Sequence, residues 1–75
     1  MGKNLVEQDF LGTSADNFKR AGKVYEQAGN KEKMKQSYQK AADLYKKYAE
    51  RLEKDGKSER AKEALKNREE CLTKT

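Results

Sequence analysis

Residues 34–52, MKQSYQKAADLYKKYAERL, decide the fold of this chain. Apolar and aromatic side chains recur there at alternating steps of four and three residues: Met34, Tyr38, Ala41, Tyr45, Tyr48 and Leu52. Such steps place all six side chains on one face of an α-helix. The pattern predicts an amphipathic helix over about residues 31–54. At about 1.5 Å per residue, this helix is roughly 35 Å long and must pack against both of its neighbours.

Two glycine-centred breaks bound this central helix. Ala28-Gly29-Asn30 precedes it, and Asp55-Gly56-Lys57-Ser58 follows it. Glycine just past a helix end takes the left-handed conformation, while Asn30 and Ser58 can cap the next helix by accepting a backbone N–H. The breaks therefore predict a separate helix on each side of the central one.

Gly12-Thr13-Ser14 suggests one more boundary, with Thr13 or Ser14 as the cap of the first helix. Three helices result, over about 14–28, 31–54 and 58–73. Because the connecting loops are short, successive helices must run antiparallel. We expect an all-α fold, an antiparallel three-helix bundle over residues 14–75.

Residues 1–13 form an N-terminal arm or a short helix in this prediction. This segment contains four large apolar residues, Leu5, Val6, Phe10 and Leu11. So many apolar side chains are not expected in a tail that makes no contact with the bundle. They pack either as a fourth short helix or as an extended arm over the open end of the bundle. The sequence leaves both arrangements open.

The composition fits one small domain. The 75 residues are 33% hydrophobic and 41% charged, values that can indicate disorder. The helical spacing of the apolar residues and the absence of proline argue against disorder. No apolar run is long enough to cross a bilayer, and the N-terminus lacks the apolar core of a signal peptide. A lone cysteine, Cys71, suits a reducing compartment, so we expect a cytoplasmic protein.

The residue types argue against catalysis. The chain has no histidine, and one cysteine without histidine gives neither a Cys–His nucleophile nor a zinc cluster. Its five glycines are scattered and form no phosphate-binding loop. We therefore expect no enzyme, no metal, no cofactor and no small-molecule substrate.

The first hairpin resembles the tetratricopeptide repeat. That family pairs helices through a small residue on each, with aromatic side chains filling the wedge between them and a glycine at the turn. The matching positions here are Phe18, Ala21, Gly22, Tyr25, Gly29, Tyr38 and Ala41. The chain departs from the family at Met34, which occupies a usually small position, and no proline closes the repeat.

A second, overlapping register begins on the central helix. The spacing of the first hairpin recurs 27 residues later, at Tyr45, Tyr48, Leu52, Gly56, Ala61 and Leu65. The central helix is therefore the second helix of one hairpin and the first helix of the next. Such a three-helix relative of the repeat is most similar in layout to the MIT domain of trafficking proteins, and SNAP-type adaptors look alike. The resemblance implies a non-catalytic adaptor that binds a peptide or helix of another protein, in protein transport or complex assembly.

Two groups of residues are candidates for partner binding. Lys19, Arg20 and Lys23 lie on the first helix, where tetratricopeptide repeats line their groove, and they would suit an acidic peptide. A second group would border the groove between the second and third helices, where MIT domains accept a partner helix. Its members are Leu44, Lys47, Arg51, Ala61, Leu65 and Arg68.

Two other classes of function remain open. The formal net charge of +5 allows a helical nucleic-acid-binding domain, although 13 acidic residues interleaved with 18 basic ones argue against it. A structural or engineered repeat protein without a ligand is the third alternative.

Overall fold

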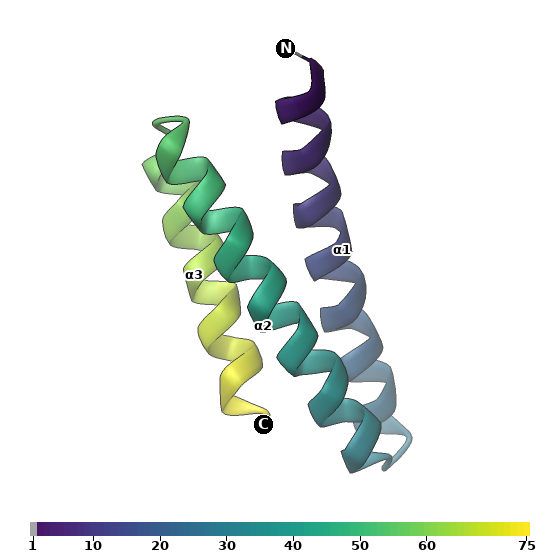
Figure 1. Ribbon diagram of the computed structural model, residues 1–75. Helices are drawn as coiled ribbons and strands as arrows, with labels where there is room; N and C mark the ends of the chain where they lie inside the picture. Colours follow the sequence, from purple (N-terminus) through teal and green to yellow (C-terminus); the bar gives the residue numbers. More distant parts are fainter. Residues whose placement is uncertain (1) are drawn as a thin grey trace.

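Three helices make up the computed structural model: α1 (Gly2–Gln27), α2 (Lys31–Lys54) and α3 (Ser58–Thr73). The structure describes the backbone of residues 2–75 and the side chains of residues 10–75. No strand occurs in this part of the chain, so the predicted all-α fold is confirmed. α1 and α3 each pack against α2 rather than against one another, and α2 lies between them (Figure 1).

The two turns stop the helices in the same way. Gly29 and Gly56 both have φ of +78°, which glycine adopts without steric cost. The N–H of Asn30 reaches back to the carbonyl of Tyr25 at 2.9 Å, and an equivalent bond follows Gly56. This is the Schellman arrangement, in which the residue after the glycine closes the last helical turn.

Only one of the two predicted helix caps forms. The side chain of Asn30 accepts a hydrogen bond from the backbone N–H of Lys33 at 3.2 Å, as expected. Ser58 is instead the first residue of α3, and Lys57 occupies the cap position without a side-chain hydrogen bond. The helix thus begins at Ser58, within the predicted range, but without the predicted side-chain cap.

The first helix starts earlier than predicted. α1 continues from Gly2 to Gln27 without a break at residues 12–14, so neither Thr13 nor Ser14 is a cap. Gly12 serves packing instead, because a Cβ there would lie 3.1 Å from Cζ of the Tyr48 ring. The side chains of Leu5 and Val6, which we expected to cover the bundle, lie outside the described residues.

The core combines small residues with a few large ones. Its buried members are Ala15, Tyr38, Ala41, Ala42, Tyr45, Ala49, Leu52, Ala61, Ala64 and Cys71. The alanines allow the helices to approach closely, and the two tyrosines and the leucine are the large side chains buried between them. Partly buried Phe18, Met34, Leu44 and Tyr48 pack against this cluster. The predicted stripe on the central helix is therefore the core face of α2.

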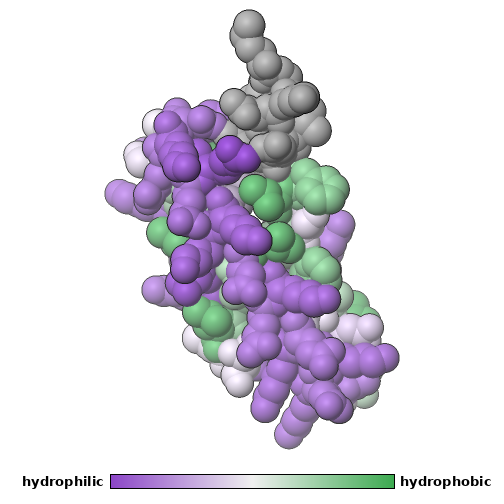
Figure 2. All heavy atoms as spheres, in the orientation of Figure 1, coloured by the Kyte–Doolittle hydropathy of each residue, from purple (hydrophilic) through white to green (hydrophobic). Residues whose placement is uncertain are grey.

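α3 packs on α2 through its small residues. Ala61, Ala64 and Cys71 face α2, whereas Leu65 and Leu72 are 36% and 42% exposed. These small residues are three and seven residues apart and share one face of the helix, which leaves the two leucines on the adjacent edge. Figure 2 accordingly shows apolar patches on both sides of a hydrophilic band that runs along α2.

Candidate partner-binding groove

A groove lies between α1 and α3, with α2 as its floor. It contains a hollow of about 370 Å³. The lining residues are Gly12, Thr13 and Asp16 of α1, Tyr45 and Tyr48 of α2, and Arg60, Glu63, Ala64 and Asn67 of α3. Since α1 and α3 run in the same direction on either side of α2, each contributes one wall. We name this feature the α1–α3 groove.

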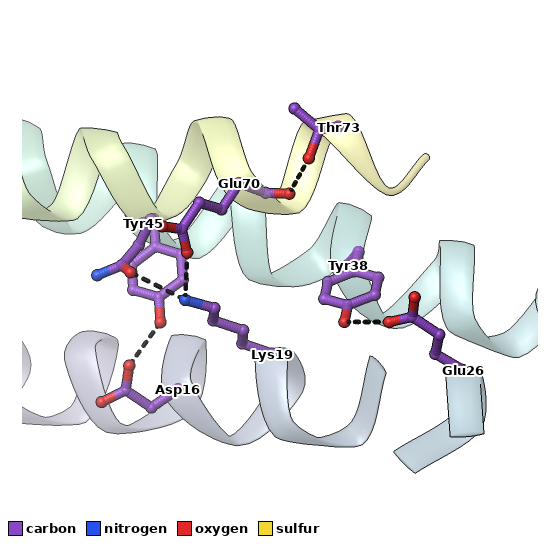
Figure 3. Close-up of polar contacts among 8 residues, drawn as sticks. Asp16, Lys19, Glu26, Tyr38, Tyr45, Glu70 and Thr73 are labelled. Atoms are coloured by element: carbon purple, nitrogen blue, oxygen red, sulfur yellow. Dashed lines mark hydrogen bonds and ion pairs between the residues drawn. The ribbon is translucent and has the colours of Figure 1, made fainter. Parts of the chain in front are cut away.

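Tyr45 joins the floor of the groove to one wall. Its hydroxyl donates a hydrogen bond to Oδ1 of Asp16 at 2.5 Å (Figure 3). Burial raises the pKa of the Tyr45 phenol, and the bond to the Asp16 carboxylate raises it further. The phenol therefore stays protonated and keeps Asp16 at the edge of the hollow.

A polar clamp closes the groove towards the carboxyl ends of α1 and α3. Nζ of Lys19 donates to Oδ1 of Asn67 at 3.0 Å and to Oε2 of Glu70 at 2.8 Å (Figure 3). The hydrogen bond from the ammonium lowers the pKa of Glu70, as does its charge. The clamp links two helices that otherwise make little contact with one another.

Glu26 forms a second link at the same end of the bundle. It accepts a hydrogen bond from the Tyr38 hydroxyl at 3.2 Å and forms a 3.1 Å ion pair with Lys74. The hydrogen bond from Lys74 lowers the pKa of Glu26, and that from Tyr38 adds to the effect. Burial and the neighbouring carboxylate raise the pKa of Tyr38 to about 12. The Glu26 carboxylate of α1 is thus joined to α2 and to the residue that follows α3.

The three candidates on the first helix have different environments. Lys19 is engaged in the clamp, so its charge is already paired within the chain. Arg20 and Lys23 are exposed, and neither forms an ion pair with a described residue. The charge of Lys23 nevertheless contributes to the lowered pKa values of Glu26 and Glu70, which places it at the closed end of the groove.

The second group of candidates does not line one groove. Ala61 is only 1% exposed and belongs to the core. Leu65 and Arg68 lie on α3. The remaining three candidates lie on α2, on the edge of that helix that faces α1: Leu44, Lys47 and Arg51. The position of Lys40 identifies this edge.

The ammonium of Lys40 lies 5.5 Å from the ring centre of Phe18 on α1. Leu44 and Lys47 follow Lys40 by four and seven residues and so share its side of the helix. Periodicity gives the positions along a helix that share a face, but it does not say which neighbour that face meets.

Sequence reasoning missed most residues that line the α1–α3 groove. On α3, Arg60, Glu63 and Asn67 recur at steps of three and four residues beside the stripe of small residues. On α1, Gly12 and Asp16 lie four residues apart on one edge. This polar periodicity is present in the sequence, but polar residues at helical spacing are also typical of an ordinary solvent-exposed helix face.

The fold defines a class: a small helical scaffold of tetratricopeptide-like type with a groove between two of its helices. A comparison with protein-family models matches residues 2–75 to the family described as "Soluble NSF attachment protein, SNAP". The chain belongs to this family, and the predicted likeness to SNAP-type adaptors is confirmed. Comparisons with curated proteins and with solved structures find no significant match. The likeness to MIT domains remains a prediction.

The family is one of adaptors, so a protein-interaction module involved in trafficking is the class of function that the match indicates. None of the described helices combines the length and hydrophobicity that a bilayer crossing requires.

Proposed function

We propose that this chain is a non-catalytic adaptor that holds a segment of a partner protein in the α1–α3 groove. The observation on which this depends is the hollow of about 370 Å³ between α1 and α3. The two wall helices, α1 and α3, are held in place by their contacts with α2. The groove is therefore formed before a partner binds. Preorganisation of this kind lowers the cost of binding.

The name of the family describes attachment to NSF, and we propose NSF as the partner to test first. A cytoplasmic adaptor in protein transport fits this partner. The sequence analysis proposed an acidic segment, and the cations near the groove support that choice. Exposed Arg60 lies at the open end and exposed Lys23 near the clamp. Acidic residues at either end of a bound segment would pair with them, and charge at a rim mainly speeds association.

The hollow itself calls for hydrogen-bonding side chains. Asp16 and Glu63 present carboxylates on opposite walls, and Asn67 offers an amide between Glu63 and the clamp. A partner residue that donates hydrogen bonds would satisfy these acceptors. We therefore propose a polar segment with one donor side chain in the hollow and acidic residues on either side.

Purified NSF titrated against the immobilised chain tests this proposal. Arg60→Glu reverses a charge at the hollow and should weaken binding at least tenfold, equivalent to about 1.4 kcal/mol. Lys62→Glu makes the same change of charge at an exposed position two residues later, on the other side of α3, and should leave the affinity within about twofold. Equal affinities of the two variants would exclude the groove, and no binding by the unaltered chain would exclude NSF.

A further inference from the structure

Two large apolar side chains remain exposed on α3, those of Leu65 and Leu72. They are seven residues apart, close to two helical turns, so they follow one another along the same edge of the helix. Arg68 and Glu69 lie between them on that edge, because residues three and four apart share a side of a helix. We call these four residues the α3 patch. Figure 2 shows apolar surface over α3, beside the hydrophilic band of α2.

The α3 patch lies on the opposite edge of α3 from the α1–α3 groove. Asn67 and Glu70 mark the groove edge, because both accept hydrogen bonds from Lys19 of α1. Asn67 is two residues from Leu65, and Glu70 is two residues from Leu72. Two residues correspond to a rotation of about 200° around the helix axis. The patch therefore faces away from α1 and does not depend on the function proposed for the groove.

The two charges of the patch have no partner in the described part of the chain. Neither Arg68 nor Glu69 forms an ion pair with a described residue. No acidic residue of α3 lies three or four positions from Arg68, the spacing that permits pairing within a helix. Those positions hold Ala64, Leu65, Cys71 and Leu72. The patch thus combines two exposed leucines with two adjacent, opposite charges that another molecule can reach.

The patch is complementary to itself. Leu65 and Leu72 each lie about 5 Å along the helix axis from the point midway between Arg68 and Glu69. A twofold axis through this point, perpendicular to the helix, brings up a second α3 in the antiparallel direction. Leu65 then meets Leu72 of the second copy, and Arg68 meets Glu69 of the second copy. Each contact occurs twice, as in any interface with twofold symmetry.

The charges select this direction of pairing. In a parallel pair of α3 helices, Arg68 would face Arg68 of the second copy, and Glu69 would face Glu69. Like charges placed opposite one another across an interface are unfavourable. The antiparallel pair replaces both repulsions by attractions and still covers the leucines. A second copy of this chain therefore satisfies the apolar and the charged residues of the patch together.

We propose that the α3 patch is the contact surface of a weak antiparallel dimer of this chain. Four residues from each copy make a small interface, and total buried areas below about 1,200 Å² are typical of transient complexes. The dimer therefore exchanges with the monomer instead of being permanent. Both α1–α3 grooves remain accessible in it, because each lies on the other edge of its α3.

Sedimentation velocity of the full chain at increasing concentration measures this dimer. The average mass should rise with concentration towards twice that of the monomer. Leu65→Gln together with Leu72→Gln should weaken self-association roughly tenfold or more, because the apolar contact is lost. The matched control is Phe10→Gln together with Val24→Gln, two apolar residues of α1 that are more exposed than the leucines. It should stay within about twofold of the unaltered chain. Circular dichroism checks that both variants fold.

An exchange of charges tests the twofold axis. Arg68→Glu leaves two acidic residues at the centre of the patch, and Glu69→Arg leaves two basic ones. Each variant alone should remain monomeric, whereas an equimolar mixture should dimerise, because the acidic pair of one chain meets the basic pair of the other. Lys31→Glu and Glu32→Lys make the same changes at an exposed pair at the start of α2. Each of these control variants should dimerise like the unaltered chain.

Four results would overturn the proposal. A monomeric mass at every concentration would exclude the dimer, and equal losses in the leucine and control variants would place the contact elsewhere. A mixture of the charge variants that associates no more than either one alone would exclude the antiparallel register. Loss of NSF binding in the leucine variant, with self-association unchanged, would assign the patch to NSF. Arg60→Glu should leave the dimer intact, so failure here is distinguishable from failure at the groove.

Discussion

Gly22 of α1 lies directly against the ring of Tyr38 on α2. A Cβ at residue 22 would be 3.0 Å from Cδ1, Cδ2 and Cε1 of that ring, and the ring is almost fully buried. The Tyr38 ring thus leaves no room for a side chain at residue 22. This contact sets how closely the first two helices approach, and so where the wall of the α1–α3 groove stands relative to its floor.

Gly22→Ala should destabilise the protein. Overpacking costs about 1–3 kcal/mol, and the better helix propensity of alanine returns about 1 kcal/mol. We expect a net loss of about 1 kcal/mol in the free energy of unfolding, measured with denaturant. Gly12→Ala is the matched control, because half-buried Tyr48 can shift away from the new methyl group. A Gly22→Ala protein as stable as the Gly12→Ala protein would contradict the close packing.

The buried tyrosines predict a loss of stability in alkali. The pKa of Tyr38 rises from 10.0 to about 12 on folding, and that of Tyr45 rises as well. The unfolded chain therefore releases these protons at lower pH than the native protein does, so stability falls as the pH rises from about 10 through 12. Tyr45→Phe should make this decline shallower in denaturant titrations at a series of pH values. Parallel curves for the variant and the unaltered protein would contradict the assignment.

Lys19 should contribute to thermal stability through its link between α1 and α3. Lys19→Met removes its bonds to Asn67 and Glu70 and should lower the midpoint of thermal unfolding. Because the ion pair is partly exposed, added salt should reduce the difference between variant and unaltered protein. Arg20→Met, at the next residue, should leave the midpoint unchanged. Equal effects of the two substitutions would argue against the clamp.

Ala61 should tolerate no larger side chain. It is buried where α3 packs on α2, so Ala61→Leu forces the helices apart and should cost about 1–3 kcal/mol. Lys62→Leu at the exposed neighbouring position should stay within about 0.5 kcal/mol. Both values come from denaturant unfolding. If Ala61→Leu were neutral, Ala61 would border an open groove, as the sequence analysis expected, and would not be buried in the core.

The sequence was sufficient for the elements that follow from local rules. The alternating steps from Met34 to Leu52 predicted both the helix and its buried face. Gly29 and Gly56 marked the turns because their positive φ suits glycine. Gly12 was misread as a break, since a glycine required by a ring on another helix looks the same in sequence as one required by a turn.

The site was predicted less well because it depends on how the helices are rotated. Leu44 lies off the stripe of the central helix and faces the α1 side of α2, whereas Leu65 lies at the exposed edge of α3. Lys19 was identified, but its role in a clamp required Glu70, 51 residues later, to be placed beside it. Long-range pairs of this kind have no local sequence pattern.

Site-specific photocrosslinking to NSF tests the groove most directly. A photoreactive amino acid in place of exposed Thr13, which lines the hollow, should crosslink to NSF. The same amino acid in place of Val24, which is 61% exposed and does not line the hollow, should not. Crosslinks from residue 24 but not from residue 13, or equal yields from both, would contradict binding in the α1–α3 groove.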